Sequence, residues 1–261
     1  GEIQARIVIN AAGNFGDVVE GIARVSPFRI RPRKGQFVVF DKPAAALVNA
    51  IILPVPTERT KGVVLFRTAF GNLAIGPTAE DQEDRETAAC DHATLLRLKE
   101  RAIAMVPQLK DVGVNAIYAG LRPASDQKDY VIEALPERNW ITVGGIRSTG
   151  LTAALGIAQH VARLARDQLG VKLRDGIRPV WTPVPNLSEY HPRPHERGGE
   201  IICHCEMVTR DEIVAAFDGP LPALDLAGLK RRTRATMGRC QGFYCSAHVA
   251  AMLRERHDGT A

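Results

Sequence analysis

Two short stretches decide how the C-terminal part of this chain folds: Cys203-His204-Cys205 and Cys240-Gln241-Gly242-Phe243-Tyr244-Cys245. They contain four of the five cysteines, as a C-x-C pair and a C-x4-C pair separated by 34 residues. Each close pair can hold one side of a metal centre once folding brings the two pairs together. We therefore expect a metal site, with tetrahedral zinc, an iron–sulfur cluster and four free thiols as the alternatives.

The residues around the cysteines favour iron–sulfur over zinc. Zinc knuckles mostly use longer spacings than C-x-C. An iron–sulfur cluster spreads its thiolates over more than one iron, so tight and loose pairs both fit. Such a cluster carries negative charge, which Arg234, Arg239 and the N–H groups of a helix beginning near residues 243–245 would offset. We interpret His204 as a spacer and not as a ligand.

The wider pattern around the two pairs resembles a known domain. The pattern reads Cys203-x-Cys205-Glu206-x-Val208-Thr209 and then Thr233-Arg234-Ala235-x-Met237-Gly238-x-Cys240-Gln241-Gly242-x-x-Cys245. It is similar to the bacterioferritin-associated-ferredoxin-like [2Fe-2S] domain. The resemblance implies that the cluster ligands are Cys203, Cys205, Cys240 and Cys245. A capping box at Thr209–Glu212 predicts one of three short helices in this part, whose core is small enough for a metal to stabilise it.

The N-terminal two thirds of the chain combine strands and helices. Alternating or β-branched runs predict strands at residues 5–13, 35–41, 50–54, 62–67, 72–75, 116–120, 130–134 and 140–143. The first of these reads as a buried parallel strand, and the series from 35 to 75 predicts an antiparallel or mixed sheet. Helices are expected at 17–23, 91–106 and 151–168, the last with an apolar stripe at Leu151, Leu155, Ala158, Ala162 and Ala165. Acidic residues 80–90 read as a solvated loop or helix start, and Cys90 as a buried or half-buried thiol.

A glycine-rich turn marks a second candidate site. The strand at 140–143 runs into Gly144-Gly145-Ile146-Arg147-Ser148-Thr149-Gly150, and the helix at 151–168 follows at once. The N-terminus of such a helix presents N–H donors to an anion or to the edge of an electron-rich ring. A tight strand-to-helix turn without any ligand would have a similar sequence, so this turn alone leaves both readings open.

Further motifs occur in a characteristic order along the chain. They are Ile9-Asn10-Ala11-Ala12-Gly13, Arg33-Lys34-Gly35-Gln36, Thr68-x-x-Gly71-Asn72-x3-Gly76-Pro77-Thr78, Gly120-Leu121-Arg122-Pro123 and Gly144-Gly145-x2-Ser148-x-Gly150-Leu151-Thr152. Together they resemble the FAD-dependent D-amino-acid-oxidase-like superfamily, which includes glycerol-3-phosphate dehydrogenases. This resemblance covers roughly residues 5–168.

The resemblance implies roles for particular residues. The residues that would face FAD are Gly13, Gly144, Gly145, Ser148, Gly150, Leu151 and Thr152. Arg122 would bind the carboxylate or phosphate of a small anionic substrate as a bidentate fork, with a structural arginine as the alternative interpretation. Arg147, inside the glycine turn, is a second candidate for the substrate anion. No residue in the sequence stands out as a general base.

The two resemblances define the expected fold and domains. The fold class is α/β (α+β): residues 1–177 form a mixed-sheet substrate domain with the C-terminal part of a FAD-binding domain. Residues 178–199, with five prolines, form a linker, and residues 200–261 form a small helical [2Fe-2S] domain. No G-x-G-x-x-G is present. We therefore expect the later part of a longer protein, in which FAD binding depends on a preceding segment.

The expected function is a FAD-dependent dehydrogenase of a small anionic metabolite, with glycerol 3-phosphate as the leading candidate. Electrons would pass from flavin to the [2Fe-2S] cluster and then to a quinone or an electron-transfer subunit. The alternatives are an amino-acid or 2-hydroxy-acid dehydrogenase, or an iron–sulfur electron-transfer or scaffold subunit without flavin chemistry of its own. A homo-oligomer and a heteromeric complex both agree with the sequence.

Composition and charge limit the partners and the location. The chain has 261 residues, a net charge of +5 and only 5% aromatic residues. Because basic residues form no stripe interleaved with aromatics, we expect no nucleic-acid partner. The longest apolar run, residues 44–55, is interrupted by Asn49 and Pro54 and is too short for a transmembrane segment. Cysteine usage indicates a reducing compartment, and we expect a cytoplasmic protein, free or peripheral at the membrane.

Overall fold

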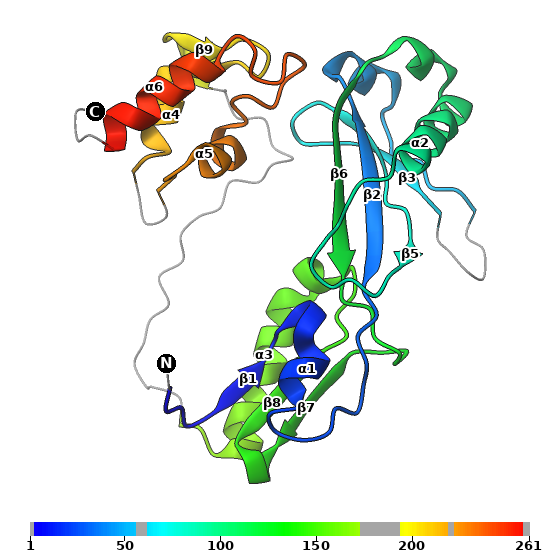
Figure 1. Ribbon diagram of the computed structural model, residues 1–261, viewed down its shortest axis with the longest axis vertical. Coiled ribbons are helices and arrows are strands. Elements are labelled where there is room, and N and C mark those ends of the chain that lie inside the picture. The colour runs from blue at the N-terminus through cyan, green and yellow to red at the C-terminus, as the bar shows by residue number, and fades with distance from the viewer. Residues whose placement is uncertain (1–2, 56–61, 173–193, 219–221, 258–261) are drawn as a thin grey trace.

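The computed structural model describes residues 3–55, 62–172, 194–218 and 222–257. Figure 1 shows three parts. A long antiparallel sheet stands above a second sheet, which carries a long helix. A small helical C-terminal part lies beside the end of the long sheet that is farther from the second sheet. Most of the predicted linker, residues 178–193, lies outside the described residues. Among the described residues, no helix is both long and apolar enough to cross a membrane.

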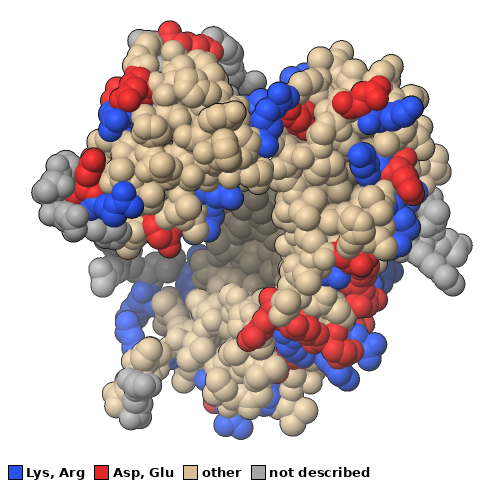
Figure 2. Space-filling model, turned by 45° about the horizontal axis from the view of Figure 1, so that its top comes forward, with Lys and Arg blue, Asp and Glu red and all other residues tan. Residues whose placement is uncertain are grey.

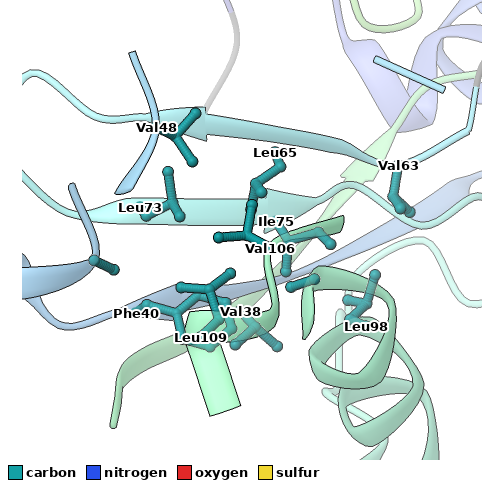
Figure 3. Packing of buried hydrophobic residues seen from close by; sticks show 12 residues of the cluster. Val38, Phe40, Val48, Val63, Leu65, Leu73, Ile75, Leu98, Val106 and Leu109 are labelled. Atoms are coloured by element: carbon teal, nitrogen blue, oxygen red, sulfur yellow. The ribbon is translucent and has the colours of Figure 1, made fainter. Parts of the chain in front are cut away.

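The long sheet has five antiparallel strands. They are β2 (Arg33–Phe40), β3 (Val64–Arg67), β4 (Leu73–Gly76), β5 (Glu80–Asp81) and β6 (Val114–Arg122), in the order β3-β4-β2-β5, with β6 also paired to β2. Helix α2 (His92–Met105) covers one face, and the carboxylate of Asp91 caps it by accepting from the N–H of Thr94. Between helix and sheet lies a core that includes Phe40, Leu65 and Leu109, none of which is exposed (Figure 3).

The second sheet joins segments that are far apart in sequence. Strand β8 (Trp140–Gly144) pairs in parallel with β1 (Val8–Asn10) and antiparallel with β7 (Val131–Leu135). Helix α3 (Gly150–Leu169) packs on β7 and β8, and α1 (Gly16–Glu20) packs on β1 and β8. The antiparallel and mixed sheets confirm the predicted α/β class. The ends of β1 and β8 lie at the same edge of this sheet, because parallel strands share their direction.

Two expectations about burial in this part were wrong. Within the described ranges strand β1 pairs only with β8 and forms the edge of the sheet, and Val8 and Ile9 are exposed. On α3 the residues that pack inward are Ala153, Ile157, Val161 and Leu164, whereas Leu151 and Leu155 of the predicted stripe are 95% and 78% exposed. Both stripes have helical spacing, so the sequence alone could not tell which one faces the sheet.

The C-terminal part forms its own small core. Its elements are β9 (Ile201–Cys203), β10 (Val208–Thr209), α4 (Arg210–Ala215), α5 (Leu226–Thr233) and α6 (Ser246–His257). Its buried cluster includes Ile213, Leu229 and Val249 together with Cys203 and Cys245. The predicted capping box is confirmed, since Thr209 and Glu212 exchange both side-chain-to-backbone hydrogen bonds. Helix α6 begins at Ser246, a few residues later than expected.

Local differences from the prediction are small. Residues 50–54 contribute only one bridge, between Ile52 and Leu65. Glu80 and Asp81, expected in a loop or helix start, form a short edge strand, and Cys90 is exposed. Short 3-10 helices complete the fold: η1 (Gly13–Phe15), η2 (Lys42–Leu47), η3 (Pro107–Asp111), η4 (Pro136–Arg138) and η5 (Pro194–Arg197).

Candidate functional site

The four predicted metal ligands come together in the C-terminal part. Strand β9 and the turn after it supply Cys203 and Cys205, and the loop before α6 supplies Cys240 and Cys245. The thiol groups pair across the two motifs: Cys203 contacts Cys245, and Cys205 contacts Cys240. The two pairs also lie near each other, since Cys203 acts on the charge of Cys205 and Cys240 on that of Cys245. Two thiol pairs therefore fit a two-iron centre better than one zinc ion.

Backbone N–H groups surround these sulfurs. Hydrogen bonds from the N–H of Tyr244, and also of Gly242 and Phe243, lower the pKa of Cys240 below its usual value of 9.0. Burial, together with the neighbouring Cys203, raises the pKa of Cys245 to about 11. Positively charged iron would favour the thiolate form of these sulfurs, and the N–H groups would donate hydrogen bonds to them. The four residues that would hold a [2Fe-2S] cluster are therefore Cys203, Cys205, Cys240 and Cys245.

Unusual backbone conformations are concentrated around the cysteines. Of the five non-glycine residues with positive φ in the described ranges, four flank the two motifs: Met207, Arg234, Thr236 and Gln241. Such conformations cost free energy and are retained mainly at functional sites and ligand clamps. Gly238 has no room for a side chain, because a Cβ there would lie 2.1 Å from the Cβ of Cys205. The loops are thus shaped to bring the sulfurs together.

The second candidate site is a pocket of about 400 Å³. It lies between the start of α3 and the end of the long sheet where Gly35 of β2 and Arg122 of β6 are found. Its lining includes Arg122 with Arg147, Ser148, Gly150 and Leu151 of the glycine turn. Gly144 and Gly145 come just before this lining. A Cβ on Gly144 would meet the ring of Phe28 at 2.6 Å, and Gly145 has a φ of +68° and would meet the hydroxyl of Ser125 at 2.7 Å. Close packing thus requires both glycines.

The predicted flavin residues lie at one edge of the second sheet. The turn before α3 follows the end of β8, and Gly13 follows the end of β1 at the same edge. Ser148, Leu151 and Thr152 are exposed there. Gly13 has a φ of +56° and nothing within 4 Å of its added Cβ, and it is not among the residues that line the pocket.

The arginines in the pocket are held by main-chain oxygens. Arg122 donates from Nε to the carbonyl of Arg33 (3.2 Å) and from Nη2 to those of Lys34 (3.1 Å) and Thr78 (2.5 Å). Arg147 donates from Nη2 to the carbonyls of Ser125 and Gln127. Burial, with the nearby Arg33, lowers the pKa of Arg122. Among the described residues neither guanidinium forms an ion pair with a carboxylate, although Asp81, which pairs with Arg33, acts on the charge of Arg122 from nearby.

The pocket and the thiols lie at opposite ends of strand β2. Gly35 and Phe37 line the pocket, whereas Asp41, just after the strand, contacts Arg239 next to Cys240. Six residues of extended chain between Gly35 and Asp41 span about 20 Å. Phe37 also lines the pocket, so the nearer wall of the pocket lies about 13 Å from Asp41 along the strand. This separation counts against a short direct step.

Two buried carboxylates had no signal in the sequence. Glu20, on α1, is fully buried and accepts hydrogen bonds from Asn10, Arg24, Trp140 and Thr142. Glu206, next to Cys205, is fully buried as well and accepts from Arg234 at 2.8 Å. Asn10, Glu206 and Arg234 belong to motifs that the sequence singled out, but no pattern in the sequence pairs them with these partners.

Comparison with known families agrees with these two sites. A family model described as FAD dependent oxidoreductase matches residues 1–164. The chain belongs to this family. A second model, the BFD-like [2Fe-2S] binding domain, matches residues 201–255, which contain all four paired cysteines. The cofactors of this FAD-dependent oxidoreductase are thus FAD and a [2Fe-2S] cluster, as the sequence predicted.

Named relatives of this oxidoreductase act on glycerol 3-phosphate. A glycerol 3-phosphate dehydrogenase of Caloramator mitchellensis is 33% identical over 95% of this chain and 54% of its own length. Subunit A1 of an anaerobic glycerol-3-phosphate dehydrogenase from Haloferax volcanii is 26% identical over 98% of this chain and 49% of its own. Among solved structures, L-alpha-glycerophosphate oxidase from Mycoplasma pneumoniae with FAD bound has a TM-score of 0.56 at 30% identity, covering 67% of this chain and 45% of that one. The chain thus spans about half the length of these relatives.

Proposed function

We propose that this chain supplies the substrate pocket and the iron–sulfur centre of a FAD-dependent glycerol-3-phosphate dehydrogenase. The observation that carries the proposal is the pocket in which Arg122 and Arg147 lie with the exposed first turn of α3. Two guanidinium groups that form no ion pair with a carboxylate in the described part of the chain match the charge of a phosphate monoester, which is close to −2 at pH 7. The names of the relatives support the same substrate.

In this proposal the residues of the pocket bind and orient the substrate. Arg122, fixed by three carbonyls, holds the phosphate so that the C2–H bond points toward the turn before α3. FAD, when bound, would supply the acceptor for the hydride that leaves C2, while the hydroxyl proton passes to water and the alcohol becomes a ketone. We propose that FAD is faced by Gly13, Gly144, Gly145, Ser148, Gly150, Leu151 and Thr152. The N-terminal end of α3 then stabilises negative charge on the reduced ring.

The test is the dependence of dye-coupled activity on substrate in the FAD-loaded protein. Arg122→Gln should raise the KM for glycerol 3-phosphate about 100-fold, since a charge-assisted hydrogen bond contributes about 3 kcal/mol. Arg147→Gln should raise KM less, and the exposed Arg138→Gln serves as the matched control. Circular dichroism checks that Arg122→Gln is folded. Turnover of an amino acid or 2-hydroxy acid, without turnover of glycerol 3-phosphate, would overturn the proposal.

We also propose that the electrons leave through the cluster to a partner, an electron-transfer subunit or a quinone. Phe243 and Tyr244, between two cluster ligands, are 81% and 71% exposed, so the cluster loop offers an apolar contact surface. The Haloferax volcanii relative is itself named as a subunit. An acceptor of this kind would place the protein at the membrane surface. Native purification followed by mass spectrometry tests this: a chain that elutes alone or only with itself would contradict a heteromeric complex.

A further inference from the structure

The C-terminal part meets the long sheet through contacts that the proposed function does not use. They include Asp41 just after β2, Lys42 at the start of η2 and Asn115 near the start of β6, which all face the loops of the cysteines. In Figure 2, Lys and Arg side chains gather where the C-terminal part and the sheet touch, above a hollow that opens toward the second sheet. The contact is formed mainly by charged and polar groups.

Lys42 compensates a buried charge beside a cluster ligand. Glu206 directly follows Cys205 and has no exposed surface. Its Oε2 accepts from Arg234 of its own domain at 2.8 Å and lies 3.3 Å from Nζ of Lys42 across the contact. Its Oε1 is buried without a hydrogen-bond partner among the described residues. Since burying an incompletely paired carboxylate is costly, the sheet's Lys42 stabilises the docked arrangement.

Asp41 pairs with a cation beside the same two thiols, Cys205 and Cys240. Arg239 directly precedes Cys240, and its Nε donates to Oδ2 of Asp41 at 2.9 Å. The side chain of Asp41 is only 14% exposed, and its Oδ1 also accepts from the N–H of Lys42. One short segment of the sheet therefore places an anion near Cys240 and a cation near Cys205.

Two neighbouring contacts fix the orientation of the domain. The guanidinium of Arg234 lies 4.2 Å from the ring centre of Phe70 and donates to the side-chain oxygen of Asn72 at 3.4 Å. Gln241, directly after Cys240, donates to the carbonyl of Asn115 at 2.8 Å. The residues of the C-terminal part that contact the sheet are thus either next to a cluster ligand in sequence or, like Arg234, paired with a residue that is.

We propose that Asp41 and Lys42 form a docking site for the [2Fe-2S] domain that also tunes the reduction potential of its cluster. Reduction adds one negative charge to the cluster, so a nearby cation favours the reduced form and a nearby anion favours the oxidised form. Lys42 raises the potential because it offsets Glu206, and Asp41 lowers it because it offsets Arg239. The proposal rests on the cluster and not on the identity of the substrate.

Docking and reduction are then linked through these charges. If Lys42 stabilises the reduced cluster more than the oxidised one, the reduced cluster binds Lys42 more tightly in return. The two positioning residues belong to the sheet and lie far in sequence from the cysteines. A change in cluster potential on their substitution therefore reports contact between the two parts in solution.

The experiment is a redox titration of the cluster in the cluster-loaded chain, followed by visible absorbance with mediators. Lys42→Gln should lower the midpoint potential, and Asp41→Asn, which keeps the geometry of the side chain, should raise it. Lys128→Gln and Asp129→Asn are the matched controls, because both residues are exposed beyond the other end of β6. Equal potentials in all variants, or shifts of the same sign for both positions, would overturn the proposal.

A second measurement tests docking directly, with a variant in which the [2Fe-2S] domain should separate from the sheet. Small-angle scattering of the wild-type chain should fit the docked arrangement, and Arg239→Ala should increase the radius of gyration while the cluster absorbance is retained. A wild-type chain already as extended as the variant would overturn docking, whatever the substrate proves to be.

Discussion

A Cβ added to Gly35 would lie 2.7 Å from Nη2 of Arg122 and 2.9 Å from the Cβ of Pro77. Strand β2 thus passes directly under the guanidinium that we assign to the substrate anion. The absence of a side chain at Gly35 lets Arg122 reach the carbonyls of Lys34 and Thr78. The glycine in the Arg33-Lys34-Gly35-Gln36 motif has a steric role that its neighbours do not share.

Gly35→Ala should therefore destabilise the sheet and weaken substrate binding together. Overpacking at a rigid contact costs about 1–3 kcal/mol, and displacement of Arg122 should raise the KM for glycerol 3-phosphate. Gly120 is the matched control for stability, since it stands opposite Gly35 in the β2–β6 ladder and its added Cβ meets nothing within 4 Å. Because Gly120 also lines the pocket, the exposed Arg138→Gln remains the control for KM. Urea unfolding and dye-coupled kinetics measure the two effects. A Gly35→Ala variant as stable as Gly120→Ala would contradict the steric role.

Gly238 plays the corresponding part at the thiols. An added Cβ would lie 2.1 Å from the Cβ and 3.3 Å from the Cα of Cys205, and a backbone atom cannot move aside as the tip of a side chain can. Gly238→Ala should displace Cys205 and reduce the iron retained per chain after reconstitution to a small fraction of the wild-type value. Gly113→Ala, where the added Cβ meets nothing within 4 Å, should retain full iron. Full iron content in Gly238→Ala would show that the cluster tolerates a shifted Cys205.

The sequence singled out candidate site residues that the structure brings together, but it did not reveal how their surroundings pack. The cysteines, Arg122 and the glycine turn were found because their chemistry limits the residue types and spacings that can serve. Which stripe of α3 faces the sheet was not found, since Leu151 and Ile157 lie on stripes with the same period. The partners of Glu20 and Glu206 come from distant segments, and a single sequence carries no signal for such pairs.

Glu20 should make stability depend on acid pH. Burial raises the pKa of its carboxyl, but hydrogen bonds from Thr142, Asn10, Arg24 and Trp140 outweigh burial and hold the pKa below its ordinary 4.5. The ionised group therefore stabilises the fold above pH 4.5, and this contribution is lost as the pH falls through the folded-state pKa.

The check is Glu20→Gln in a Trp181→Phe background, so that fluorescence reports on the buried Trp140, whose Nε1 donates to Glu20 at 3.1 Å. At pH 7 the free energy of unfolding should fall by about 2 kcal/mol, because charge-assisted buried hydrogen bonds are lost. The difference between the two proteins should narrow below pH 4. A constant difference from pH 7 to pH 3 would rule out the ionised carboxylate as its source.

The length of β2 predicts two separate steps in the flow of electrons. The pocket is lined by Gly35 and Phe37, and the docked cluster lies beyond Phe40, so about 13–20 Å of strand separates the pocket lining from Asp41. Electron tunnelling slows steeply with distance, so the cluster should be reduced later than the flavin.

In anaerobic stopped flow with saturating glycerol 3-phosphate, the FAD-loaded protein should lose flavin absorbance first. A slower phase from the cluster should follow, with a rate independent of substrate concentration. Cys205→Ser, which removes one cluster ligand, should keep only the first phase. Reduction of both centres in a single phase at every substrate concentration would mean that a shorter path joins them than the docked arrangement provides.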